Sequence, residues 1–134
     1  MLAPGLTATR LFLHVLAATV WVGGQIVVAG MLPTIRGLGD AAPRAVARAF
    51  ARLSWPAYAV LLITGFWNIA AVHPSHQTTP WKVVLGVKLG VVVLAGVAAF
   101  LHSRASTRLG LAVWGSLSGL SAMTALLLGV LLAG

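Results

Sequence analysis

Four long apolar runs dominate this sequence and constrain its fold more than any other feature. They cover residues 11–32, 53–72, 81–102 and 109–132 of a 134-residue chain, and only short polar connections separate them. A bilayer core about 30 Å thick requires about 20 mostly apolar residues per spanning helix. Only 7% of the residues are charged, whereas about 25% is typical of a soluble domain. The sequence therefore predicts an all-α integral membrane four-helix bundle, with residues 1–134 forming a single transmembrane domain.

The boundaries of the first two runs carry helix start and stop signals. No positive charge precedes the first run as far as Thr9, and the run is long enough to span, so we expect a retained helix rather than a cleaved signal peptide. Pro33 predicts the end of this helix. Arginines then recur every four residues before the second run, which indicates a helix whose basic face lies at the membrane surface.

The basic residues predict the orientation of the chain. Six arginines lie in the two connections that follow the first and third runs: 36, 44, 48, 52, 104 and 108. The opposite side has only Arg10 and Lys82. Because short cytoplasmic loops are enriched in Lys and Arg, both termini and the segment 73–80 are predicted to be extracytoplasmic.

The net charge of +8 has the same explanation. In a soluble protein it would suggest nucleic-acid binding, but here the basic residues flank apolar runs, so the predicted partner is the lipid bilayer and not nucleic acid. Cysteine is absent, which excludes disulfides, thiolate metal sites and a cysteine nucleophile.

A few polar or aromatic residues inside the spans are candidates for a binding site. His14, Asn68 and Lys88 are predicted in the outer half of the first, second and third spans, and an ionisable residue in a span suggests function. Trp21 lies on the same predicted helix face as His14, where it would fill the core or form a wall against a bound ring. Each has a structural alternative, such as an interhelical hydrogen bond for His14 or snorkelling for Lys88.

Two further histidines, His73 and His76, lie in the connection between the second and third spans. Imidazole is a common metal ligand, so these residues are candidates for metal capture at the outer surface. The alternative is that they are ordinary polar residues of a loop.

Three segments resemble the copper-resistance D (CopD) family of bacterial inner-membrane proteins. They are RLFLHVLAATVWVGG at 10–24, FARLSWPAYAVLLITGFW at 50–67 and KVVLGVKLGVVVLAGVAAFLHSR at 82–104. The most specific parts are an intramembrane His followed by Trp-x-Gly-Gly, the Thr-Gly pair late in the second span, and the Lys within the third. The order is preserved over about three of the four spans.

The CopD resemblance implies a multi-pass protein of the bacterial inner membrane that binds or transports copper. By this analogy His14 would be the buried ligand, and His73 and His76 would capture copper at the periplasmic side. Copper has high affinity for imidazole. The chain lacks the Met-rich or Cys-bearing entry segment of larger copper-resistance proteins.

A weaker resemblance, to HemJ-type protoporphyrinogen oxidases, rests on His14, Lys88 and His102. It implies a haem b protein with His14 as axial ligand and Lys88 as partner of a porphyrin carboxylate. His14 and His102 are predicted at opposite membrane faces, so only single-histidine ligation is compatible with the spans.

Three hypotheses follow, of which a copper-binding or copper-transport protein is the first. The alternatives are a haem b-binding membrane oxidoreductase and an accessory subunit of a larger membrane complex. We expect a non-enzymatic protein unless haem is the cofactor, with Trp21 and Asn68 as further cofactor-binding candidates. The sequence leaves open a homo-oligomer or a partner membrane subunit.

Overall fold

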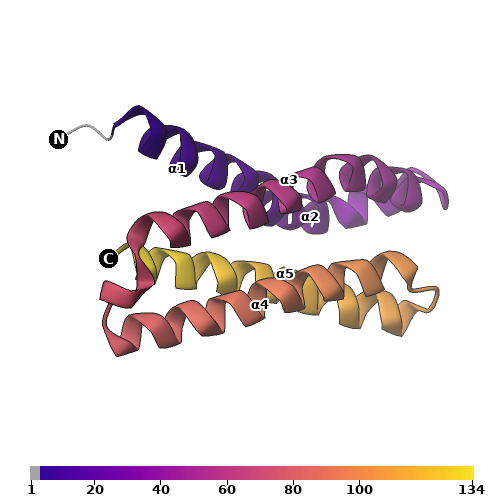
Figure 1. Cartoon of the computed structure of the whole chain (residues 1–134). Coiled ribbons are helices and arrows are strands. Elements are labelled where there is room, and N and C mark those ends of the chain that lie inside the picture. The colour runs from indigo at the N-terminus through magenta and orange to yellow at the C-terminus, as the bar shows by residue number, and fades with distance from the viewer. Residues whose placement is uncertain (1–3) are drawn as a thin grey trace. The chain divides into compact units, whose positions relative to one another are not determined.

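The computed structural model describes residues 4–134 and confirms an all-α fold (Figure 1). Four helices are long and apolar enough to cross a membrane: Gly5–Gly37, Ala42–Val72, Thr79–Arg104 and Arg108–Ala133. No β-strand occurs within the described part of the chain. The helices group into two compact units, the first ending at Val72 and the second beginning at His73. The orientation of the termini across the membrane stays a prediction.

The first unit contains α1 (Gly5–Ala18), the π-helical turn η1 (Thr19–Gly23), α2 (Gly24–Gly37) and α3 (Ala42–Val72). The segments from α1 to α2 form one continuous helix, against which α3 packs. The buried residues of α3 are the small Ser54, Ala57 and Thr64. Small side chains allow helix backbones to approach closely, which is how helices associate in lipid.

The first helix does not end at Pro33 as predicted, because α2 continues through this proline to Gly37. Proline removes one backbone N–H and therefore one intrahelical hydrogen bond, but its fixed φ is compatible with the helix. The helix ends where Leu38 donates a backbone hydrogen bond to Ile35 and Gly39 adopts a positive φ of 131°. In α3 the arginine-bearing segment and the second span form one helix, which is continuous through Pro56.

The π-helical turn η1 inserts an irregularity in the middle of the first helix. The side-chain amide of Gln25 donates a hydrogen bond of 2.9 Å to the carbonyl oxygen of Trp21. In lipid, side chains and local π adjustments of this kind satisfy backbone groups that a regular helix would pair. Directly after the turn, the Phe50 ring lies where a Cβ on Gly24 would stand, so α2 and α3 approach closely there.

The second unit is the antiparallel pair α4 (Thr79–Arg104) and α5 (Arg108–Ala133), preceded by the 3-10 turn η2 (Pro74–His76) (Figure 1). The hydroxyls of Thr78 and Thr107 accept backbone N–H groups at the two helix starts. Such caps satisfy donors that have no partner within the helix. At the crossing the buried residues are again small: Ala95, Gly96, Ala98, Ser118, Ser121 and Ala122.

Glycines at Gly-xxx-Gly spacing occur in both helices, Gly86 and Gly90 in α4 and Gly115 and Gly119 in α5, but three of these four do not lie at the α4–α5 contact. A Cβ added at Gly86, Gly90 or Gly119 would meet no atom of the chain within 4 Å. Of these four glycines, only Gly115 has a close neighbour, because the ring of His102 lies 3.0 Å from where its Cβ would stand. The contact instead uses the alanines and serines of the two helices, which provide the same close approach.

Candidate functional site

The first predicted site residue, His14, lies in α1 and faces α3. Its ring Nδ1 is 2.7 Å from Oγ1 of Thr64, which is 2% exposed. The ring Cε1 also packs over Gly65, 3.7 Å from where a Cβ would stand there. The Thr-Gly pair of α3 therefore forms the surface on which this imidazole rests.

The hydrogen bonds of Thr64 determine which nitrogen of His14 carries the proton. The single hydroxyl proton of Thr64 donates to the carbonyl oxygen of Val60 at 2.6 Å. With this bond in place Oγ1 accepts from His14, so Nδ1 carries a hydrogen, and in the neutral ring Nε2 is then the nitrogen with the lone pair. Metal-binding histidines characteristically donate from their second nitrogen to a fixed partner in this way. In the neutral ring, Nε2 of His14 is therefore the nitrogen that a metal would use.

Two polar groups lie one turn from the His14–Thr64 contact, on the same two helices. Arg10 precedes His14 by four residues, and Asn68 follows Thr64 by four. Because α1 and α3 run antiparallel, both steps move about 6 Å in the same direction along the interface. Among residues 4–134, Arg10 Nε and Asn68 Oδ1 are the buried side-chain polar atoms without a hydrogen-bond partner.

Trp21 is 4% exposed and belongs to an aromatic cluster beside the π-helical turn. Its ring centroid lies 4.6 Å from that of Tyr58 and 5.5 Å from that of Trp55, both in α3. Aromatic pairs at these separations stabilise a core beyond their buried area. The contacts assign Trp21 a packing role between the first helix and α3.

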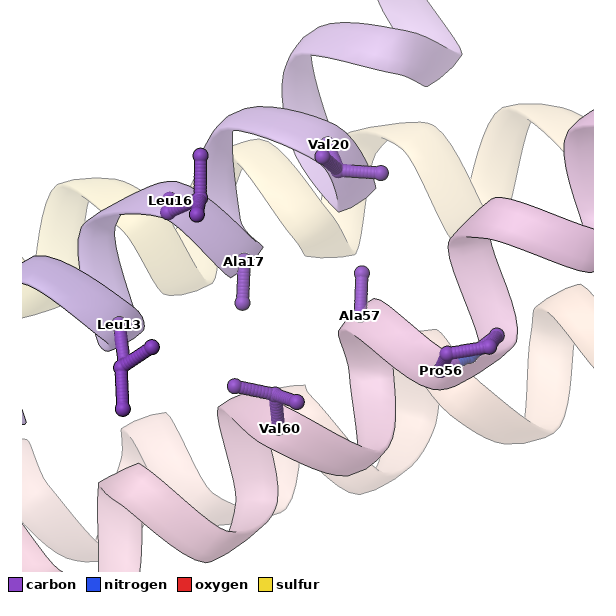
Figure 2. A pocket seen from close by; sticks show the side chains of 7 residues that line it. All are labelled: Leu13, Leu16, Ala17, Val20, Pro56, Ala57 and Val60. Carbon is purple, nitrogen blue, oxygen red and sulfur yellow. The ribbon is translucent and has the colours of Figure 1, made fainter.

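An apolar groove of about 230 Å³ lies between side chains of α1 and η1 and side chains of α3 (Figure 2). Ala17 and Ala57 face each other across it. It is lined by Leu13, Leu16, Ala17, Val20, Pro56, Ala57 and Val60. The polar contacts of the first unit therefore adjoin a groove whose lining side chains are all apolar.

His73 and His76 lie in the second unit, exposed on the turn that precedes α4. Their ring centroids are 6.0 Å apart. Two imidazoles that share one ion, each with a metal–nitrogen bond of about 2.0 Å, have centroids about 5–6 Å apart. His73 adopts a left-handed φ of 50°, and the backbone N–H of His76 donates to its carbonyl oxygen, so the turn fixes both positions.

Lys88 lies half-buried in α4 of the second unit, against a glycine of α5. Its Nζ is 2.9 Å from where a Cβ would stand on Gly129. The glycine thus provides the space that the ammonium group occupies. The chain has one acidic residue, Asp40, which lies in the connection before α3, so no carboxylate side chain in any span can balance Lys88.

His102 has a structural contact at the other end of α4. Its Nδ1–H donates to the carbonyl oxygen of Leu111 at 2.9 Å and so ties α4 to α5 beside their short connection. The sequence indicated a histidine at the membrane interface here, and the fold supplies this hydrogen bond.

The structure thus groups the predicted site residues by unit. His14 and Asn68 share the α1–α3 interface, whereas His73, His76 and Lys88 belong to the second unit. Within residues 4–134, no three His, Cys, Asp or Glu side chains gather into a metal-binding group. From the sequence, Arg10 was used only to predict the orientation of the chain across the membrane. Its spacing of four from His14 is the signal that links it to the site.

Comparisons with protein-family models, with curated proteins and with solved structures found no match.

Proposed function

We propose that this chain is a membrane copper-binding protein of the CopD type, with His14 as the buried ligand. The hydrogen bond from His14 Nδ1 to Thr64 carries the proposal, since it directs the lone pair of Nε2 away from that contact. Imidazole binds copper strongly, and divalent copper has the highest affinity of the first-row series for nitrogen sites.

The exposed pair His73 and His76 supports capture of copper at the surface. Their separation is compatible with one ion held between the two rings. In this scheme the pair is the outer site and His14 is the buried site, and copper is the cargo. Both sites use imidazole, because the chain has no cysteine.

A titration of the purified protein with copper, in competition with a chromophoric chelator, tests the buried site. His14→Ala is expected to abolish the tighter class of binding. His102→Gln is the matched control, because it removes another helical imidazole with the same Nδ1–H donor. Equal loss in both variants, or no loss in His14→Ala, would contradict the proposal.

Haem b is the second candidate, and the surroundings of Lys88 favour it. This ammonium lacks a carboxylate partner in any span, and the carboxylates of a porphyrin would provide one. A single imidazole such as His14 suffices as an axial haem ligand. In this alternative the protein would be an oxidoreductase, and Soret absorption by the purified protein distinguishes it from the copper protein.

A further inference from the structure

The two unpartnered polar atoms, Arg10 Nε and Asn68 Oδ1, belong to α1 and α3 of the first unit and require an explanation. A buried polar atom without a hydrogen bond is costly, and the cost is greater for a charged group. The fold places these two atoms on adjacent helices at the same level, one turn beyond His14 and Thr64.

No acidic side chain lies near Arg10. Its one acidic side chain is Asp40, which follows α2 at the opposite end of the helix that begins with α1. Thr64 is no further partner for Arg10, because its hydroxyl already accepts from His14 and donates to Val60. A hydrogen bond from Arg10 Nε–H to Asn68 Oδ1 would satisfy both atoms but would leave the charge of the guanidinium unbalanced. No side chain therefore supplies a counter-anion for this guanidinium.

We propose that Arg10 and Asn68 form a binding site for an oxyanion, here called the Arg10–Asn68 site. Arg10 Nε–H donates to one anion oxygen, in a charge-assisted hydrogen bond of the kind arginine makes with phosphate and carboxylate. A 180° turn of the Asn68 amide presents its NH₂ group to a second oxygen, since the two ends of an amide are nearly equivalent in shape.

The oxyanion has two sources that share this chemistry. One is the phosphate of an anionic lipid headgroup, because α1 is an apolar helix with exposed Leu11, Phe12 and Val15. The other is a free oxyanion such as inorganic phosphate. The Arg10–Asn68 site does not need a metal on His14, so it is independent of the proposed copper function.

The test uses the whole protein in detergent after chelator treatment, so that no metal contributes. Retention of phosphatidylglycerol is measured by native mass spectrometry. In parallel, the unfolding temperature is measured in phosphate and in chloride at equal ionic strength. Arg10→Gln and Asn68→Leu are compared with the wild type, and Lys82→Gln is the control because it removes an exposed basic residue outside the site.

We expect the wild type to bind one of the two probes and both site variants to bind it about tenfold more weakly, the loss of one charge-assisted hydrogen bond. Lys82→Gln should bind like the wild type. Retained phosphatidylglycerol identifies a lipid, and stabilisation by phosphate identifies a free oxyanion. If Arg10→Gln does not fold, Arg10→Lys and Asn68→Leu provide the comparison. The site is refuted if neither probe binds, or if Lys82→Gln weakens binding as much.

Discussion

At the scale of single residues, the Thr64 hydroxyl holds the imidazole of His14 through a hydrogen bond of 2.7 Å. Thr64→Val keeps the shape of the side chain but removes the acceptor of the Nδ1–H bond. Loss of such a supporting partner typically weakens metal binding about 10–100-fold, and we expect that reduction in a copper titration. Thr64→Ser retains the hydroxyl and should bind within a few-fold of the wild type. Equal affinities for the Val and Ser variants would show that this hydrogen bond does not prepare the ligand.

Gly115 provides a residue-scale test of the α4–α5 pair. A Cβ there would stand 3.0 Å from the Cε1 and Nδ1 atoms of His102, whose ring is held by its bond to Leu111. Gly115→Ala should therefore lower the unfolding temperature in detergent, because the ring must move and its hydrogen bond weakens. Gly119→Ala is the control, since its Cβ meets no atom within 4 Å. A similar unfolding temperature for both variants would contradict the described packing of His102.

At the scale of elements, the junction after η1 should be sensitive to side-chain volume. A Cβ on Gly24 would stand 2.8 Å from Cζ of Phe50 and closer still to Cε2. Overpacking of this kind costs about 1–3 kcal/mol, so Gly24→Ala should lower the unfolding temperature. The neighbouring Gly23→Ala meets no atom within 4 Å and should leave it unchanged or slightly raised. The reverse order would show that α2 and α3 do not meet at Phe50.

The elements also show what the sequence could predict and what it could not. Each spanning helix is encoded by local composition, so the four helices were predicted and confirmed. The π-helical turn at Thr19–Gly23 was not predicted. Such a turn shifts the periodicity of polar and apolar residues along the helix, and a segment with few polar residues shows too little periodicity for this shift to be detected. Pro33 was predicted to end a helix that continues, since a stop signal does not reveal whether its missing hydrogen bond is tolerated.

The candidate site could likewise be predicted only in part from the sequence. His14 and Asn68 were predicted because polar residues in apolar runs are conspicuous. Their shared interface depends on the pairing of α1 with α3, which the local sequence does not encode. The contribution of Arg10 was missed for that reason: its partner helix had to be known before its burial could be recognised.

At the scale of the whole molecule, the arginine distribution predicts both termini outside. The chain has no cysteine, so single-cysteine variants report position directly. Ser75→Cys, in the turn η2, should react with a membrane-impermeant maleimide in intact cells. Ser106→Cys, in the connection between α4 and α5, should react only after the membrane is permeabilised. The opposite pattern would invert the topology and place His73 and His76 on the cytoplasmic side.

Metal binding at His14 is tested most directly by two measurements on each of two purified proteins. The wild type and His14→Ala are purified in mild detergent without added metal, and the absorption spectrum and copper content are recorded together. We expect the wild type to retain copper and to lack a Soret band, and His14→Ala to have lost the copper. A Soret band that is present in the wild type and absent in His14→Ala would show that His14 binds haem b and not copper. Equal metal and haem content in both proteins, or none in either, would contradict the assignment of His14 as a ligand.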